Sequence, residues 1–157
     1  MERVIVVVGP TGVGKTKMSV ELAKRFNGEV INADSMQIYK ELNIGTAKIK
    51  ETEKERIVHH LFDIKEVEDN YTVYDYQKDA RNKIEEITNS NKLPIMVGGT
   101  GLYIKACLYN YEFKEEIKNP NNYNDMNKEE LYELLIKLDP NTTIHINNKQ
   151  RLIRALN

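Results

Sequence analysis

The sequence is poor in cysteine, in charge of one sign and in long apolar runs, and each shortage argues against a class of protein. Its single cysteine, Cys107, has no partner for an internal disulfide, which favours a reducing compartment. The 23 lysines and arginines nearly balance the 24 aspartates and glutamates, so the net charge is −1 with histidine neutral. A protein without a global positive excess lacks the simplest electrostatic mark of a nucleic-acid binder, and only a local basic patch would supply it.

Membrane-spanning runs and metal-binding clusters are also missing. The longest aliphatic run, residues 4–8, is far shorter than the roughly 20 residues that cross a bilayer. We therefore expect a cytoplasmic protein without membrane contact, and 157 residues fit one domain with a real core. His59 and His60 are adjacent, should point apart on a strand, and have no Cys or carboxylate set around them, so we interpret both as structural.

Short β-branched runs predict the strands of a parallel sheet. Residues 3–8 (RVIVVV) are apolar without alternation, which is typical of a strand buried on both faces. Residues 29–33 and 93–97 are similar, and residues 60–64 are a candidate fourth strand. Helical spacing over residues 16–26 and 72–88 alternates with these runs and predicts an α/β fold, a P-loop NTPase-like parallel sheet flanked by helices.

The two predicted helices each have an apolar face. The second begins with Thr72 and Asp75 in the arrangement of a capping box. The residues expected to be buried are Met18, Leu22, Ala23 and Phe26 in the first helix, and Val73, Tyr76, Ala80, Ile84 and Ile87 in the second.

The pattern changes after Tyr109, where asparagine becomes frequent. We predict a core domain over residues 1–110, a reduced insertion or loop over 111–127, and C-terminal helices packing on the core over 128–157. Asn127 can cap the first of these helices, and the last is expected over residues 148–156.

A phosphate-binding loop follows the first predicted strand. Residues 9–16 read GPTGVGKT and match G-x-x-x-x-G-K-[ST] in full, directly before a predicted helix. Its glycines let backbone N–H groups converge on phosphate oxygens, Lys15 adds a positive charge, and the Thr16 hydroxyl can ligate Mg²⁺. We therefore predict that a di- or triphosphate binds to Gly9, Pro10, Thr11, Gly12, Val13, Gly14, Lys15 and Thr16.

Asp34 follows the second predicted strand, at the edge where open α/β sheets bind ligands. A carboxylate beside a phosphate either orients a metal or takes a proton from an attacking nucleophile. Ser35 and Gln37 offer neutral donors and acceptors of the kind that pair with a nucleobase edge. The alternative is that Asp34 and Ser35 only close a turn.

The motifs together carry a resemblance to a known family. The segments are GPTGVGKT at 9–16, INADSMQIYKELNIGTAK at 31–48, HHLFDI at 59–64, LPIMVGGTGLYIKA at 93–106 and LDPNTTIHINNKQRLIRAL at 138–156. In this order they resemble the tRNA dimethylallyltransferases, which modify the adenosine immediately 3′ of the anticodon. The resemblance implies that the phosphate loop grips the diphosphate of dimethylallyl diphosphate, with Mg²⁺ on Thr16. It also implies three catalytic residues: Asp34 takes a proton from adenine N6, while Lys15 and the Mg²⁺ on Thr16 stabilise the charge that gathers on the leaving diphosphate.

The resemblance further implies the partners, which are dimethylallyl diphosphate and a tRNA anticodon stem-loop, bound by a monomer. Arg151 and Arg154 lie three residues apart on a predicted helix and can touch adjacent phosphates, although a solvated surface pair is the alternative. Thr100 is either an RNA contact or only the N-cap of the next helix. The implied tRNA-binding residues are Asp34, Ser35, Met36, Gln37, Thr100, Gln150, Arg151, Leu152, Ile153 and Arg154.

The chain departs from the family in length. Members are typically much longer, with a larger helical insertion and further C-terminal helices, so we expect either a fragment or a reduced homologue. Three other functions stay open: an adenylate isopentenyltransferase, a small P-loop kinase in which Asp34 activates a hydroxyl, and an inactive fragment that only binds diphosphate.

Overall fold

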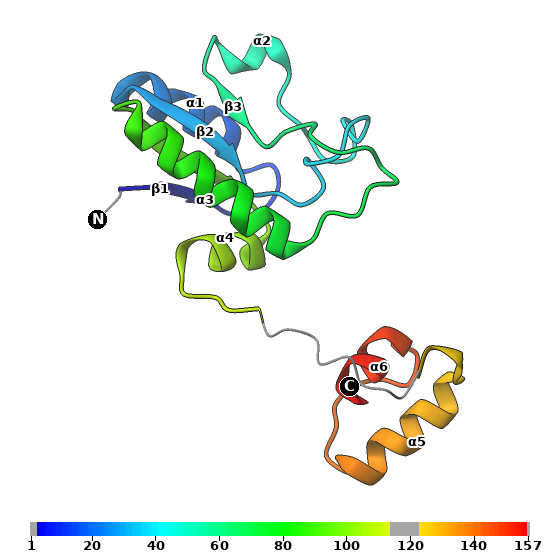
Figure 1. Ribbon diagram of the computed structural model, residues 1–157. Helices are drawn as coiled ribbons and strands as arrows, with labels where there is room; N and C mark the ends of the chain where they lie inside the picture. Colours follow the sequence, from blue (N-terminus) through cyan, green and yellow to red (C-terminus); the bar gives the residue numbers. More distant parts are fainter. Residues whose placement is uncertain (1–2, 114–122, 157) are drawn as a thin grey trace. The chain divides into compact units, whose positions relative to one another are not determined.

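The computed structural model describes residues 3–113 and 123–156, and the chain divides into two compact units (Figure 1). Unit 1, Met1–Phe113, contains a four-stranded sheet with helices on its faces. Unit 2, Lys114–Asn157, contains two helices. The predicted boundary near residue 110 therefore lies close to the division between the units.

The sheet of unit 1 is parallel throughout, as predicted. Its strands are β1 (Ile5–Val8), β2 (Gly28–Asn32), β3 (His59–His60) and β4 (Leu93–Gly98), in the spatial order β1-β4-β2-β3. Because all four strands run the same way, the loops that follow them gather at one edge of the sheet.

Helices cover both faces of the sheet. Helix α1 (Lys15–Phe26) lies on one face, and α3 (Val73–Asn89) and α4 (Gly101–Leu108) lie on the other (Figure 1). A single turn of helix, α2 (Glu51–Lys54), precedes β3. Helix α3 begins with the predicted capping box of Thr72 and Asp75.

Strand pleating divides the core between the two faces. Val30 and Ile95 pack with Ala23 of α1, whereas the neighbouring Ile31 and Met96 pack with residues of α3 and α4. Successive side chains of a strand point to opposite faces, so a run without alternation is what two covered faces require.

The predicted buried face of α1 is partly wrong. Met18 is 58% exposed and Phe26 is 49% exposed, while the buried residues are Ser19, Val20 and Ala23. The small side chains of Ser19 and Ala23 suit the side of a helix that lies against a sheet, whereas hydrophobicity alone favoured the larger side chains.

The predicted fourth strand is also too long and begins one residue late. Only His59 and His60 pair with β2. Leu61 and Asp63 have positive φ values of 61° and 54°, which no extended strand accommodates. Residues 61–64 therefore form a loop beside the end of β2 rather than a strand.

Gly98 ends β4 where the chain runs closest to β2. A Cβ at this position would lie 2.2 Å from both the carbonyl carbon and the carbonyl oxygen of Ala33. This close approach accompanies a hydrogen bond of 3.1 Å from the Thr100 N–H to that same oxygen. Glycine at 98 thus allows the turn after β4 to lie against the backbone that follows β2.

We predict that Gly98→Ala destabilises the protein by about 3 kcal/mol, the upper part of the range for overpacking, because backbone atoms cannot move aside as a side chain would. Gly101→Ala is the matched control, since a Cβ there has no neighbour within 4 Å. Its free energy of unfolding should stay unchanged or rise by up to about 1 kcal/mol, as glycine is a poor helix former. Urea denaturation of the three proteins measures both effects, and equal midpoints would contradict the close-packing argument.

Unit 2 has a small core of its own. Helix α5 (Lys128–Leu138) begins with a capping box of Asn127 and Glu130, and α6 (Lys149–Leu156) packs against it. The buried residues between the helices are Leu131, Leu135, Leu152 and Leu156. The predicted loop falls largely on residues 114–122, outside the described part, and a short 3₁₀ turn, Tyr123–Asp125, follows. The packing of these helices on the core domain stays a prediction.

No helix among residues 3–113 and 123–156 is long and apolar enough to cross a membrane.

Candidate active site

The phosphate loop joins β1 to α1 through three glycines with positive φ. These are Gly9 at 154°, Gly12 at 87° and Gly14 at 88°. Gly14 is the N-cap of α1, so the helix begins at Lys15 and points its free N–H groups into the loop. The Lys15 ammonium donates to the carbonyl oxygen of Pro10 at 2.8 Å, which keeps it at the rim of the loop. This arrangement of N–H groups and one cation is what an anionic phosphate requires.

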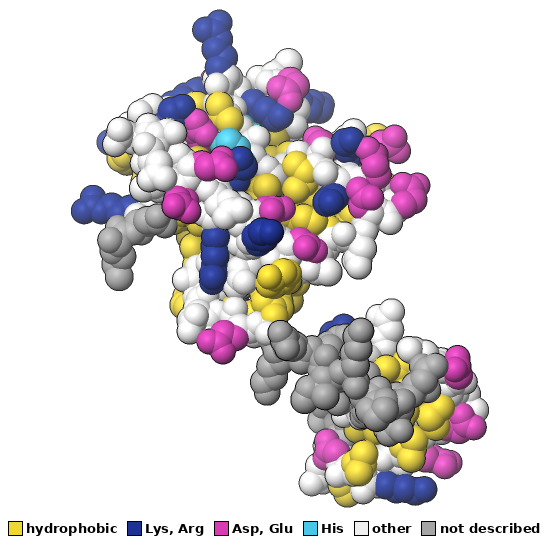
Figure 2. All heavy atoms as spheres, viewed as in Figure 1, with side chains coloured by type: hydrophobic (Ala, Val, Ile, Leu, Met, Phe, Trp, Pro, Cys, Tyr) yellow, Lys and Arg dark blue, Asp and Glu magenta, His cyan; other side chains and the backbone are white. Residues whose placement is uncertain are grey.

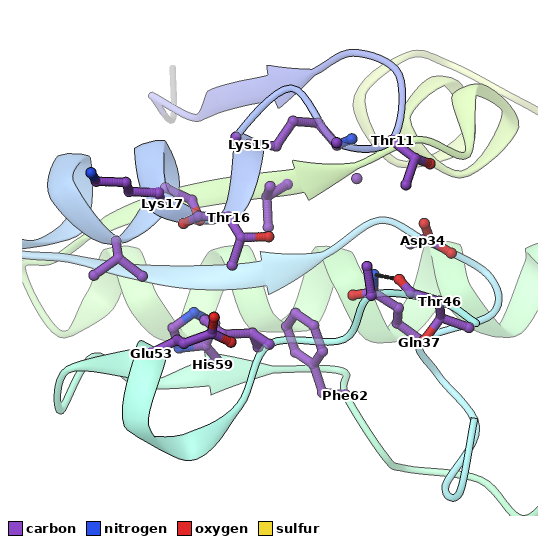
Figure 3. A pocket seen from close by; sticks show the side chains of 18 of the residues that line it. Thr11, Lys15, Thr16, Lys17, Asp34, Gln37, Thr46, Glu53, His59 and Phe62 are labelled. Atoms are coloured by element: carbon purple, nitrogen blue, oxygen red, sulfur yellow. Dashed lines mark hydrogen bonds between the residues drawn. The ribbon is translucent and has the colours of Figure 1, made fainter. Parts of the chain in front are cut away.

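A cavity of about 580 Å³ opens between this loop and the end of β2. Figure 3 shows Thr11, Lys15 and Thr16 on one side and Asp34 and Gln37 on the other. Part of each predicted set, the phosphate residues and the base residues, therefore lines a common space, although the two sets are separated in sequence. Of these predicted residues, those that do not line it are Gly9, Pro10, Val13, Ser35, Met36 and Thr100.

Asp34 closes a turn and also faces the cavity. Its Oδ1 accepts from the Met36 N–H at 3.0 Å, and its carbonyl accepts from the Gln37 N–H at 3.2 Å. A Cβ built on Gly99 would lie 4.0 Å from Asp34 Oδ2 and 4.0 Å from the Gly9 carbonyl oxygen. The phosphate loop, Asp34 and the turn after β4 thus meet at one point. Asp34 therefore closes a turn, as the alternative interpretation required, but it also lines the cavity.

Gln37 is oriented by a contact with its neighbour in the cavity wall, Thr46. Its Nε2 donates to the Thr46 carbonyl at 2.8 Å, drawn as a dashed line in Figure 3. With the amide nitrogen held in this way, its Oε1 is the acceptor that remains for a ligand. Met36, in contrast, is 51% exposed.

Thr100 stands at the N-cap of α4, but its side chain does not cap the helix. Its Oγ1 accepts from the Ser35 N–H at 2.9 Å and lies 3.3 Å from the Ser35 hydroxyl. Thr100 therefore joins the turn after β4 to the turn after β2. The alternative interpretation of Thr100 as the N-cap residue of α4 is confirmed, although its side-chain oxygen binds Ser35 and not the helix.

Lys48 is a residue whose role the sequence did not reveal. Its side chain is 4% exposed, and its Nζ donates to the Tyr39 carbonyl at 2.6 Å and to Asp63 Oδ1 at 2.5 Å. These bonds hold the segment that follows Asp34 against the loop after β3. The only available signal was the IGTAK sequence, since a buried lysine cannot be recognised from composition.

The far end of the cavity is lined by residues to which the sequence assigned no role in ligand binding. Glu53 and Phe62 lie there with His59 (Figure 3). His59 Nδ1 donates to the Ile57 carbonyl at 2.9 Å, and burial lowers the pKa of His59, so the ring is neutral at pH 7. Its Nε2 is buried and has no hydrogen-bond partner among the described residues. Both histidines make protein contacts, since His60 Nε2 bonds Glu29 Oε2 at 2.6 Å.

The predicted C-terminal RNA contacts all lie on α6 in unit 2. Gln150, Arg151 and Arg154 are exposed, and Ile153 is half-buried. Leu152 is fully buried in the core of the unit. The two arginines are thus available to a polyanion, whereas Leu152 holds the helix in place.

Charge is mixed over the visible surface. Figure 2 shows Lys and Arg side chains interspersed with Asp and Glu on each unit, in keeping with the near-zero net charge. Any attraction for a polyanion must therefore come from local groups rather than from a global field.

The chemistry of the cavity fits Mg²⁺. Thr16 and Asp34 bring a hydroxyl and a carboxylate oxygen to the same space. Mg²⁺ usually takes one or two protein oxygens and completes its shell with water and phosphate oxygens. The described residues contain no group of three His, Cys, Asp or Glu side chains that could hold a metal, so phosphate oxygens would have to supply the remaining ligands.

Comparisons with known proteins identify the family of the chain. The IPP transferase family profile matches residues 37–157. A tRNA dimethylallyltransferase of Anoxybacillus flavithermus is 52% identical over 99% of this chain and 51% of its own length. That of Bacillus subtilis is 49% identical over 98% of this chain and 52% of its own. The chain thus spans about half the length of the curated relatives it matches.

Solved structures give the same result. A eukaryotic dimethylallyltransferase acting on tRNA matches with a TM-score of 0.82 at 36% identity, over 98% of this chain and 40% of that chain. A full-length tRNA isopentenylpyrophosphate transferase of Bacillus halodurans matches with a TM-score of 0.72 at 43% identity, over 99% of this chain and 55% of that chain. The chain belongs to the IPP transferase family.

Proposed function

We propose that this chain carries the catalytic core of a tRNA dimethylallyltransferase, which moves a dimethylallyl group from its diphosphate to N6 of the adenosine 3′ of the anticodon. The observation that carries the proposal is the single cavity shared by the phosphate loop and Asp34. A phosphate loop alone fits many nucleotide enzymes. A carboxylate and an oriented glutamine facing it supply what a nucleobase amine needs, and relatives about half identical to the chain are tRNA dimethylallyltransferases.

The phosphate loop holds the leaving group in this proposal. Its N–H groups and the Lys15 ammonium bind the diphosphate and stabilise the negative charge that gathers there as the allylic C–O bond breaks. Thr16 would hold Mg²⁺, which when bound neutralises part of that charge. The Lys15 ammonium has three N–H donors, and the Pro10 carbonyl takes only one of them, so the others can bind the anionic diphosphate.

Asp34 acts as the base. The N6 amine of adenine forms the new C–N bond to the allylic carbon, the C–O bond breaks with its electron pair going to diphosphate, and Asp34 takes the proton that N6 loses. Gln37 Oε1 accepts from the adenine, and the turn from Asp34 to Gln37 surrounds the base once it has been flipped out. Arg151 and Arg154 would bind backbone phosphates of the tRNA.

A transfer assay tests the proposal. The chain is incubated with Mg²⁺, radiolabelled dimethylallyl diphosphate and an RNA with the sequence of an anticodon stem-loop. Label in the RNA is the expected result. A stem-loop with guanosine at the modified position is the matched control, because it lacks the N6 amine. Label on free AMP instead of RNA would favour the adenylate-prenylating alternative, and hydrolysis of ATP without transfer would favour a kinase.

A further inference from the structure

Asn32 is the last residue of β2 and is fully buried. Its side chain makes three hydrogen bonds. Oδ1 accepts from the Asp34 N–H at 2.9 Å, and Nδ2 donates to the carbonyl oxygens of Asp34 and Leu61, both at 3.0 Å. Because carbonyl oxygens only accept and an N–H only donates, this is the one amide orientation that satisfies all three partners. The side chain therefore grips both backbone polar groups of Asp34.

Asn32 is itself held from the far side of the sheet. The Tyr76 hydroxyl of α3 donates to the Asn32 carbonyl at 2.8 Å. Burial raises the pKa of Tyr76, so this hydroxyl stays protonated and remains a donor. The Tyr76 ring stacks on Tyr103 of α4, with centroids 3.9 Å apart and planes 13° apart. Asn32 thus connects the packing of α3 and α4 to the backbone of Asp34.

The consequence for Asp34 is that one carboxylate oxygen is engaged and the other is not. Oδ1 accepts from the Met36 N–H, while Oδ2 accepts no hydrogen bond from any residue in the described ranges. The side chain can aim Oδ2 at a ligand only if the backbone at residue 34 does not rotate. The Asn32 amide restrains that rotation because it binds the N–H and the carbonyl on either side of the Asp34 Cα.

We propose that Asn32 is a positioning residue, which keeps the Asp34 carboxylate directed into the cavity. The inference rests on the proposed function, in which Asp34 is the base. The competing explanation is purely structural: Asn32 would only satisfy buried polar groups, and its loss would harm the whole site equally. A positioning role predicts that loss of Asn32 lowers turnover but not donor binding. A purely structural role predicts that both fall together.

The test compares Asn32→Ala with Asn32→Ser in the transfer assay. The two variants are close in size, but the serine hydroxyl can still accept from the Asp34 N–H, as in an ST turn. We expect Asn32→Ala to lower kcat by about 100-fold, the cost of a misplacement near 1 Å, with the KM for dimethylallyl diphosphate within about twofold of wild type. The kcat of Asn32→Ser should be about tenfold higher than that of Asn32→Ala. Adding Asn32→Ala to the Asp34→Asn variant should not lower kcat any further, since both substitutions act through the Asp34 carboxylate.

Each outcome of this test either supports or contradicts the positioning role of Asn32. A kcat equal to wild type in Asn32→Ala would overturn the inference, and so would a parallel loss of kcat and donor affinity that serine does not rescue. If circular dichroism shows that Asn32→Ala does not fold, the test is the comparison of Asn32→Ser with wild type. A lowered kcat at unchanged KM would then support the inference, and full activity would contradict it. Absence of transfer by the wild type contradicts the proposed function first and removes this inference with it. That result differs from an active wild type with an unaffected variant.

Discussion

Replacing Asp34 by asparagine is expected to slow prenyl transfer by about 10²- to 10⁴-fold, the usual contribution of a general base. Asparagine keeps an oxygen for the Met36 N–H, so the turn after β2 should survive. It cannot take a proton at neutral pH, so the N6 amine loses its acceptor. Single-turnover transfer of labelled dimethylallyl to the stem-loop measures the rate, and calorimetry with dimethylallyl diphosphate measures donor binding.

Donor affinity separates the two roles that a carboxylate can have in this position. A general base does not contact the diphosphate of the donor. The Kd of the Asp34→Asn protein for dimethylallyl diphosphate should therefore stay within about twofold of wild type. Loss of donor affinity together with loss of transfer would indicate that Asp34 orients the metal. Asp34→Ala should lose transfer as well, and wild-type turnover in either variant would refute the assignment of the base.

Removal of the loop cation is expected to give the second large effect, this time on binding. Lys15→Met should weaken the affinity for diphosphate by about 10- to 150-fold, because a charge-assisted hydrogen bond contributes roughly 1.5–3 kcal/mol. The Lys15 ammonium already lies at the rim of the loop, 2.8 Å from the Pro10 carbonyl, so it needs little movement to reach a phosphate. Calorimetric titration with inorganic pyrophosphate and Mg²⁺ measures the change without requiring turnover.

Lys78→Met is the matched control for charge. Lys78 is an exposed lysine of α3 that does not line the cavity, so its loss removes one positive charge from unit 1 without touching the loop. We expect its Kd for pyrophosphate to change less than about twofold, since exposed charges are screened at physiological salt. Equal weakening by both substitutions would mean that net charge, rather than the loop, holds the diphosphate.

Strong local patterns predicted the fold of unit 1 well. Of the predicted strand over residues 3–8, Ile5–Val8 form β1 of the parallel sheet, and the Thr72 capping box starts α3. The errors came where packing outweighs hydrophobicity. Met18 and Phe26 are large and apolar, yet α1 turns the small Ser19 and Ala23 toward the sheet. Positive φ at Leu61 and Asp63 ended the fourth strand. Aspartate tolerates this conformation, but a leucine at residue 61 gives no sign of it.

In the candidate site, too, some residues could be predicted from the sequence and others could not. The phosphate loop and Asp34 could be identified because their spacing is tied to their chemistry. Thr11, Gly12, Gly14, Lys15 and Thr16 of the loop line the same cavity as Asp34. Asn32 and Lys48 could not, since both act through contacts with residues distant in sequence, Leu61 and Asp63 among them. A polar residue at the end of a strand has many explanations until its partners are known.

The strand order has a consequence for how the protein folds. The phosphate loop follows β1 and Asp34 follows β2, yet these strands do not pair with each other; Ile95 of β4 is the partner of both Ile5 and Val30. Each half of the site is therefore made early in synthesis but has no fixed place until β4 leaves the ribosome. Such high contact order makes closure of the sheet slow, since the intervening chain must be ordered first. Competence to bind diphosphate should thus arise late and in one step.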